Sequence, residues 1–371
     1  MKFIHCSDTH LGFSDYYKID PQTGINQREQ DFYIAWQRLI DEVLQRQPDF
    51  VIHAGDLFHT TRPSNRAIAV ALEGIQRISD AGIPFILISG NHSTPKIRAT
   101  GSIFESIALF PGIHAAFQSQ YEKYSICGGT VHCIPHCSLT EDLQAAFAAI
   151  QPDSHAQFQV LVAHGAWAGN SSFSMGEFNE QKLPNPEETT AVEFDYIALG
   201  HYHKHIRIKP QICYSGATER TSFNEADNTP GFVEVDLQTQ QVDHFALPSR
   251  PMFKLGPLDC SELNSVQIYD ELVKWSTDDL KEALVSLQLI NIHHETLVKL
   301  DGREIDAIFP QVFHLQKSLS RQVGIAGTGP SQTEWGSVPI EFERYIQGVK
   351  DKELDKGRLR ELGLSYLTKD Y

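Results

Sequence analysis

The chain has few cysteines and lacks long apolar runs. Six cysteines in 371 residues, several of them within strand-like apolar segments, are too few for a disulfide framework. We therefore expect reduced thiols and a cytoplasmic location. No segment reaches the roughly 18–20 apolar residues that span a bilayer, and no apolar signal segment precedes the first predicted strand. Association with a membrane is therefore not expected.

Basic residues are also fewer than acidic residues. The chain has 31 Lys and Arg against 47 Asp and Glu, which gives a formal net charge of −16. This excess of negative charge provides no global attraction for nucleic acid. It does not exclude DNA as a partner, because bound divalent cations reverse the local field. An anionic substrate would have to be attracted locally, by metal ions or by a basic patch.

Strand and helix patterns alternate over the first 250 residues, which predicts α/β architecture. The early part predicts helices at 27–47 and 66–81 and strands at 50–54 and 84–89. The later part predicts one helix at 140–150. It also predicts strands at 130–134, 160–163, 196–199, 211–215, 231–236 and 242–246.

Composition divides the rest of the chain. Prolines between 248 and 257 mark a boundary, so we expect a first domain at 1–250 and a small α/β unit at 251–325. Within that unit the pattern predicts a helix near 278–287 and a strand near 296–300. Residues 326–339 have the composition of a flexible linker. The tail, 340–371, predicts two short amphipathic helices.

Five predicted strands each run into side chains that can bind metal. These residues are Asp8 and His10, Asp56, Asn91 and His92, His164, and His201 and His203. In open α/β sheets, ligands bind outside the carboxyl ends of the strands. The pattern therefore predicts a dinuclear metal centre at one edge. Carboxylate, amide and imidazole donors suit Mn²⁺, Fe²⁺ or Zn²⁺ better than Ca²⁺.

Each of these residues taken alone would more often be structural; five strands that deliver such residues to one edge favour the metal site. His5 and His53 lie inside strands and are expected in the core. The segment 132–137 (HCIPHC) contains two His and two Cys. It lacks the usual zinc-site spacing, so we interpret it as a strand and its exit.

The motifs resemble those of the calcineurin-like metallophosphoesterases in order and type. The matching elements are Asp8-x-His10, Gly55-Asp56, Gly90-Asn91-His92, His164 and Gly200-His201-x-His203. The resemblance covers roughly the first 220 residues. It implies an α/β fold, a two-sheet sandwich flanked by helices, with the metals at one edge.

Within that superfamily the chain most resembles the SbcD-type DNA-repair exonucleases. The residues that carry this are 6–12 (CSDTHLG), 54–59 (AGDLFH) and 214–220 (YSGATER). Beyond about residue 250 the resemblance is in layout only. It implies that 251–325 is a capping domain over the site and that the helical tail docks onto an SbcC-type coiled-coil ATPase. It also implies a possible homodimer.

The resemblance also implies roles for the site residues. Asp8, His10, Asp56 and His203 would hold the first of two divalent ions, expected to be Mn²⁺. Asp56, Asn91, His164 and His201 would hold the second, with Asp56 bridging. His92 would stabilise the transition state and protonate the leaving oxygen, and His59 would face the phosphate from the side. Ser93 stands where the family usually has an acid that could orient His92, so another group would have to orient it.

Several basic residues follow the metal motifs and could line a groove for the phosphate backbone. They are Arg62, Arg66, Lys96, Arg98, Lys204 and Arg207. Surface Arg and Lys are common, so an ordinary solvated surface is an equally good interpretation.

The first functional hypothesis is a two-metal DNA nuclease, with exonuclease and endonuclease activity, that works in DNA repair or recombination with an ATPase. The alternative is a generic metallophosphoesterase acting on small phosphodiesters or phosphomonoesters. Phosphoprotein phosphatases are disfavoured because the Asp-Arg-Gly typical of them does not follow Asp56. A non-enzymatic scaffold is disfavoured by the complete ligand set.

Overall fold

The computed structural model describes residues 1–94, 101–167, 181–184, 193–322, 342, 345–346 and 356–367. The chain divides into two compact units, Met1–Arg321 and Gln322–Tyr371.

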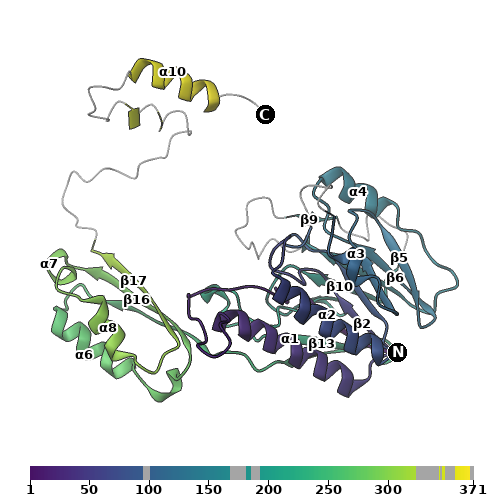
Figure 1. The fold of residues 1–371 in the computed structure, drawn as a ribbon, viewed down its shortest axis with the longest axis horizontal. Helices are drawn as coiled ribbons and strands as arrows, with labels where there is room; N and C mark the ends of the chain where they lie inside the picture. The colour runs from purple at the N-terminus through teal and green to yellow at the C-terminus, as the bar shows by residue number, and fades with distance from the viewer. Residues whose placement is uncertain are drawn as a thin grey trace. The chain divides into compact units, whose positions relative to one another are not determined.

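Two six-stranded sheets form the first part of the larger unit (Figure 1). The first sheet has the order β14 (Gln241–Ala246), β13 (Gly231–Asp236), β1 (Lys2–Cys6), β2 (Phe50–His53), β3 (Phe85–Ile88) and β4 (Ile113–Ala116). The second has the order β11 (Ile206–Lys209), β12 (Ile212–Tyr214), β10 (Tyr196–Gly200), β7 (Gln159–His164), β6 (Gly129–Ile134) and β5 (Glu122–Ile126). A two-stranded pair, β8 (Ala166–Trp167) and β9 (Lys182–Leu183), lies outside both.

The strands that carry the predicted ligands run parallel within their sheets. In the first sheet β1 pairs with β2 and β2 with β3; in the second, β7 pairs with β10. Parallel strands place their carboxyl ends at the same edge. The predicted ligands of each sheet therefore leave it on the same side.

The two sheets pack face to face around an apolar core. Phe3, Phe50 and Ile52 of the first sheet are fully buried in one cluster with Val160 and Val162 of the second. The rings of Phe3 and Phe50 stack with centroids 4.7 Å apart. Side chains alternate between the two faces of a strand, so the residues between these face the helices instead. The result is the predicted α/β sandwich.

Helices cover the outer faces (Figure 1). The first sheet packs against α1 (Gln27–Arg46) and α2 (Asn65–Asp80), which begin at the side-chain caps Asn26 and Ser64. The short α3 (Phe104–Ile107) joins the same cluster. Helix α4 (Thr140–Ala148) packs on the second sheet. The helices and strands predicted for the first 250 residues are confirmed, apart from differences of one or two residues at their ends.

A separate three-stranded parallel sheet follows. It consists of β15 (Met252–Asp259), β16 (Leu284–Ile292) and β17 (His314–Arg321). Its helical segments are α6 (Ser265–Trp275), η3 (Asp278–Leu280), α7 (His294–Leu297) and α8 (Gly302–Ile308). The α/β character of this stretch is as expected.

Two elements predicted within this stretch are wrong. The helix near 278–287 is a single 3₁₀ turn followed by β16, and the strand near 296–300 is replaced by α7. Glu282 adopts a left-handed φ of 56°, which ends the helical turn. The residues just before β16, 278–283 (DDLKEA), include the strong helix formers Leu, Lys, Glu and Ala, which favoured the predicted helix. Within β16 itself, residues 285–289 (VSLQL) alternate between buried and more exposed side chains, as a strand does.

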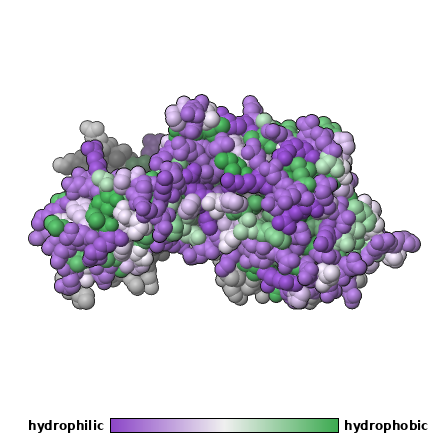
Figure 2. Space-filling model, turned by 90° about the horizontal axis from the view of Figure 1, so that it is seen from below, coloured by the Kyte–Doolittle hydropathy of each residue, from purple (hydrophilic) through white to green (hydrophobic). Residues whose placement is uncertain are grey.

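In the smaller unit the structure describes α10 (Lys356–Leu367), which lies within the predicted helical tail. The predicted linker, 326–339, lies outside the described residues. Among the described residues, no helix is long and apolar enough to cross a membrane. The face in Figure 2 is largely hydrophilic with scattered apolar residues.

The packing of α1 on α2 reverses the usual effect of replacing a helical glycine. A Cβ on the buried Gly74 would lie 2.3 Å from Nε1 of Trp36, which donates to the carbonyl of Val70 at 3.1 Å. Ala normally gains about 1 kcal/mol over Gly in a helix, but overpacking costs about 1–3 kcal/mol. We expect Gly74→Ala to lower the free energy of unfolding by about 1–2 kcal/mol, as measured by urea denaturation.

The matched control is Gly302→Ala at the start of α8. A Cβ there meets only Nζ of Lys317, at 3.7 Å, so this variant should be neutral or slightly more stable than wild type. Equal stability of both variants would contradict the tight contact between α1 and α2.

Candidate metal centre

The loops that follow β1 and β2 are joined by backbone hydrogen bonds. The amide of Asp8 donates to the carbonyl of Gly55, and the amide of His10 to the carbonyl of Asp56, both at 3.0 Å. These bonds continue the pairing of the two strands beyond their ends. They place the predicted ligands of the first two motifs next to each other.

Four of the predicted ligands have left-handed backbone. Their φ angles are 52° at Asp8, 43° at His10, 55° at Asp56 and 107° at His201. Non-glycine residues in this region cost about 1–3 kcal/mol each and cluster at functional sites. These four residues are at most 6% exposed. The surrounding packing therefore keeps their backbone in this conformation. The backbone is therefore held in a costly conformation that aims the side chains at one place.

The first group of donors consists of Asp8, His10 and His203, whose ligand atoms lie within 4.8 Å of one another. Nε2 of His10 and Nε2 of His203 are 2.9 Å apart. The carboxylate of Asp8 accepts from the Ser7 hydroxyl at 2.5 Å and from the His201 amide at 3.0 Å. The group corresponds to the first predicted ion position.

The second group consists of Asp8, Asp56 and His164, whose ligand atoms also lie within 4.8 Å of one another. Nε2 of His164 lies 3.2 Å from Oδ2 of Asp56 and 2.9 Å from Oδ1 of Asn91. Nδ1 of His164 bonds to the Ala54 carbonyl at 2.8 Å, which directs Nε2 toward the carboxylate. The ring of His201 lies 5.4 Å from that of His164, centroid to centroid. Asp56, Asn91 and His164 of the predicted second ligand set therefore lie together, whereas the groups of close donors among the described residues do not include His201.

Glycine is required beside two of these ligands. A Cβ on Gly55 would lie 2.3 Å from Nδ1 of His164, and a Cβ on Gly90 would lie 2.2 Å from Oδ1 of Asp56. Neither distance occurs for real Cβ atoms. The glycines in the second and third motifs therefore let backbone approach the ligands closely.

The donors fit divalent cations. Burial alone would raise the pKa of Asp56, but the nearby His164, His10 and His92 hold it well below its usual range. Burial lowers the pKa of His164, yet the carboxylate of Asp56 outweighs it and raises the pKa to about 9. Buried carboxylates need compensating positive charge. Carboxylate, amide and imidazole donors are those of Mn²⁺, Fe²⁺ and Zn²⁺ sites.

His59 and His92 lie beside this centre, and with His10 they form a third group of close donors. The rings of His59 and His92 stack with centroids 5.1 Å apart, and Nδ1 of His92 bonds to the carbonyl of His59 at 3.0 Å. The hydroxyl of Ser93 accepts from the Gly90 amide at 3.1 Å. A backbone carbonyl therefore orients His92, and Ser93 stabilises the turn that precedes it.

Of the basic residues predicted to line a groove for the phosphate backbone, two contact groups of their own chain. Arg66 is 3.8 Å from the carboxylate of Glu29, and Arg207 donates to the carbonyl of Pro210. Arg62 and Lys204 are exposed. Lys96 and Arg98 lie outside the described residues.

The residues assigned to the core are buried as expected. Nδ1 of His5 bonds to the hydroxyl of Tyr196 at 3.0 Å, and Nε2 of His53 to the hydroxyl of Thr9 at 3.1 Å. Burial lowers the pKa of each to about 3. Among the described residues, no group of close donors includes His132, Cys133 or Cys137.

One residue at the centre escaped the sequence analysis. Oε1 of Glu225 lies 3.0 Å from Nδ1 of His203. Glu225 belongs to the 3₁₀ turn η2 (Phe223–Glu225), and a short turn has no periodic pattern that marks its buried face. Only the YSGATER segment just before it gave any signal.

The family model described as calcineurin-like phosphoesterase matches residues 1–205, more than half of the 371-residue chain. This range contains every predicted metal ligand and ends two residues after His203.

Among curated proteins, the chain is similar to several named DNA double-strand break repair protein Mre11. The Haloferax volcanii protein is 28% identical over 295 residues, 78% of this chain and 61% of its own length. Those of Methanococcus maripaludis (28% over 251 residues) and Thermoplasma acidophilum (30% over 262) match 64% and 65% of this chain. The chain covers 63% of the length of each of these two, so it spans under two thirds of these relatives.

Among solved structures, TT1561 of Thermus thermophilus covers 66% of this chain and 98% of its own length. Its TM-score of 0.39 and identity of 9% are too low to support an argument.

The donor set predicts that metal stabilises the protein. A ligand that binds only the folded state at 100 times its dissociation constant adds about 2.7 kcal/mol. We expect Mn²⁺ to raise the midpoint of thermal unfolding and EDTA to reverse the shift, as measured by differential scanning calorimetry.

The Asp56→Asn variant should lose most of this shift. Asp243→Asn, on the exposed face of β14, should keep it. An equal Mn²⁺ response in both variants would show that the ion binds elsewhere.

Proposed function

Because the chain belongs to the calcineurin-like phosphoesterase family, we propose that it is a metal-dependent nuclease of the SbcD type that hydrolyses phosphodiester bonds in DNA. The observation that carries the proposal is the convergence of Asp8, His10, Asp56, His164 and His203 in groups of close, buried donors. The names of the relatives support DNA as the substrate. Both exonuclease and endonuclease activity, in DNA repair or recombination, belong to this proposal.

We propose the ligand sets given above: Asp8, His10, Asp56 and His203 for one ion, and Asp56, Asn91, His164 and His201 for the other. Two such ions, Mn²⁺ in our proposal, would clamp the attacking and leaving oxygens of an in-line displacement and activate water as the nucleophile. Asp56 suits the bridging role because Oδ2 faces His164 while its own loop is bonded to that of His10.

His92 and His59 would act on the substrate. The carbonyl of His59 fixes the ring of His92 at the edge of the donor groups. From there His92 would stabilise charge in the transition state and donate a proton to the leaving oxygen. His59 is packed between Phe13 and His92, with ring centroids 5.0 and 5.1 Å away. It would face the phosphate from the side.

We propose that 251–325 acts as a capping domain that limits which DNA ends reach the metals. Residues 326–339 would act as a linker, and 340–371 would dock onto an SbcC-type coiled-coil ATPase. A homodimer and a cytoplasmic location complete the proposal. The described helix α10 exposes Leu359 and Leu362, and exposed apolar side chains on a helix suit helix-in-groove recognition.

The alternative is a generic phosphoesterase for small phosphodiesters or phosphomonoesters. The observation that favours it is charge. The net charge is −16, and two of the four described basic residues near the motifs already contact groups of their own chain.

Substitution of Asp56, the proposed bridging ligand, tests whether DNA cleavage depends on the metal centre. Asp56→Asn keeps the shape of the side chain but removes its charge. We expect Mn²⁺-dependent cleavage of single- and double-stranded DNA to fall roughly 1,000-fold or more, because metal catalysis contributes several kcal/mol. Nuclease assays beside Asp243→Asn measure this effect. Cleavage retained by Asp56→Asn with two ions bound would exclude the bridging role.

A wild-type protein that turns over a small phosphodiester with Mn²⁺ but leaves DNA intact would favour the alternative. The same assay with an added SbcC-type ATPase separates this outcome from dependence on the partner.

DNA binding should depend steeply on salt if the basic residues contact phosphates. Each neutralised phosphate adds about 0.7–0.9 to the slope of log affinity against log salt. We expect Arg62→Ala and Lys204→Ala each to lower the slope by about 1, as measured by fluorescence anisotropy with Ca²⁺ in place of Mn²⁺. Arg77→Ala near the end of α2, where Arg77 pairs with Asp41, is the control. If Arg62→Ala and Lys204→Ala leave the slope of log affinity against log salt as unchanged as the control does, Arg62 and Lys204 are ordinary solvated surface residues.

A further inference from the structure

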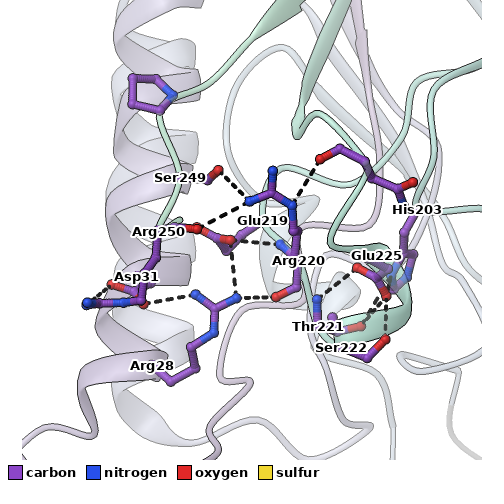
Figure 3. Close-up of polar contacts among 12 residues, drawn as sticks. Arg28, Asp31, His203, Glu219, Arg220, Thr221, Ser222, Glu225, Ser249 and Arg250 are labelled. Atoms are coloured by element: carbon purple, nitrogen blue, oxygen red, sulfur yellow. Dashed lines mark hydrogen bonds and ion pairs between the residues drawn. The ribbon is translucent and has the colours of Figure 1, made fainter. Parts of the chain in front are cut away.

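Glu225 lies against the ring of His203 (Figure 3). Its Oε1 is 3.0 Å from Nδ1 of His203, and the two side chains are only 9% and 10% exposed. The amide and the hydroxyl of Thr221 both donate to the oxygens of Glu225, so this carboxylate acts as an acceptor. A charged carboxylate accepts hydrogen bonds and cannot donate them. His203 therefore carries a proton on Nδ1, and this N–H donates a hydrogen bond to Glu225.

The two nitrogens of an imidazole point in different directions. With Nδ1 engaged by Glu225, Nε2 of His203 faces Nε2 of His10 at 2.9 Å, within the group that includes Asp8. The Nδ1–H tautomer leaves the lone pair on Nε2. Glu225 therefore lies on the far side of the ring from the donor group, where it can orient His203 but cannot share its ion.

Both oxygens of Glu225 are held in place. The hydroxyl of Thr221 donates to Oε1 at 2.6 Å, and the amide of Thr221 donates to Oε2 at 2.9 Å. Figure 3 shows Thr221 and Ser222 beside this carboxylate. Glu225 cannot rotate away from His203 without losing these bonds as well.

The segment that carries Thr221 is anchored in turn. Arg220 donates to the Asn228 carbonyl at 2.9 Å and to the Ser249 hydroxyl at 3.1 Å. Arg28, which is 1% exposed, donates to Glu219 at 3.2 Å and to the carbonyl of Arg220. In Figure 3, Arg220 lies between the Arg28 cluster and the Glu225–His203 pair. Buried charge-assisted bonds of this kind fix geometry.

The histidine of the second donor group is held differently. Nδ1 of His164 bonds to a neutral backbone carbonyl, that of Ala54, which side-chain substitution leaves in place. A carboxylate behind a ligating histidine fixes its tautomer and raises its basicity, and its loss typically costs 10–100-fold in metal affinity. The two ion positions should therefore respond differently to the loss of Glu225.

We propose that Glu225 is a positioning residue that holds His203 with Nε2 toward the first ion position, so that this position depends on the 219–225 segment and the second does not. This inference rests on the proposed metal-dependent function. It goes beyond it by assigning an orienting group to one ion position.

The test is Mn²⁺ binding to the full chain, measured by isothermal titration calorimetry. Glu225→Gln keeps the shape but removes the charge and places an amide N–H₂ against the Thr221 or His203 donors. We expect one of two Mn²⁺ sites to weaken 10–100-fold while the other keeps its affinity. Glu234→Gln is the matched control, since Glu234 pairs with Arg46 at 3.0 Å on another part of the first sheet.

A spectroscopic readout separates positioning from a general structural role. In the Zn²⁺-loaded wild type, imidazole ¹⁵N NMR should show a hydrogen-bonded Nδ1–H on His203, and this signal should shift or disappear in Glu225→Gln. If that variant does not fold, Thr221→Val removes one bond to Oε1. It should weaken the same site by less than tenfold.

The outcomes are distinguishable from those of the nuclease proposal. Equal affinity of wild type and Glu225→Gln at both Mn²⁺ sites, or equal weakening of both, overturns the positioning role without touching DNA cleavage. Two Mn²⁺ sites of which one depends on Glu225, in a protein that does not cleave DNA, supports the positioning role and contradicts the nuclease. Absence of Mn²⁺ binding by wild type contradicts both.

Discussion

The site depends on the parallel pairing of β1 with β2 and its continuation by backbone bonds past the strand ends. The amides of Asp8 and His10 donate to the carbonyls of Gly55 and Asp56. Two carboxylates are thereby buried side by side, although like charges in a low dielectric repel. The imidazoles of His10 and His164 and the amide of Asn91 gather around them because the neighbouring strands also end there. A divalent cation, bound as we propose, would complete the charge balance of this arrangement.

The support around the donors differs from one ligand to the next. His164 is directed by a backbone carbonyl, His92 by another, and His203 by the side chain of Glu225. Carbonyls are supplied by the strands and loops themselves and persist under most substitutions. A side-chain carboxylate can be changed by one mutation. In our proposal the first ion position is thus the more sensitive to mutation, and the segment behind it is anchored through Arg220 and Arg28.

Much of the fold was predictable because the first 250 residues are locally consistent. Helix α1 shows helical periodicity with an Asn cap, and the strands before the motifs are short apolar runs bounded by glycine. The stretch around β16 was not predictable in the same way. The helix formers at 278–283 favour a helix that would run into β16, whereas in the structure β16 pairs with β15 and β17. Pairing partners far along the chain overrode the local preference there.

The sequence by itself determined the α/β class of the first part, because helix and strand periodicities alternate along it. It also determined which candidate donors follow each strand, because these residues stand directly after the apolar runs. Tertiary structure alone decided which donors share a group, since Asp8 and His203 lie 195 positions apart in the numbering. It also decided the partners of each imidazole, such as Glu225 behind His203 and the His59 carbonyl behind His92. Those contacts depend on how the two sheets and their loops pack against each other. Residue periodicity and spacing in the sequence do not predict that packing.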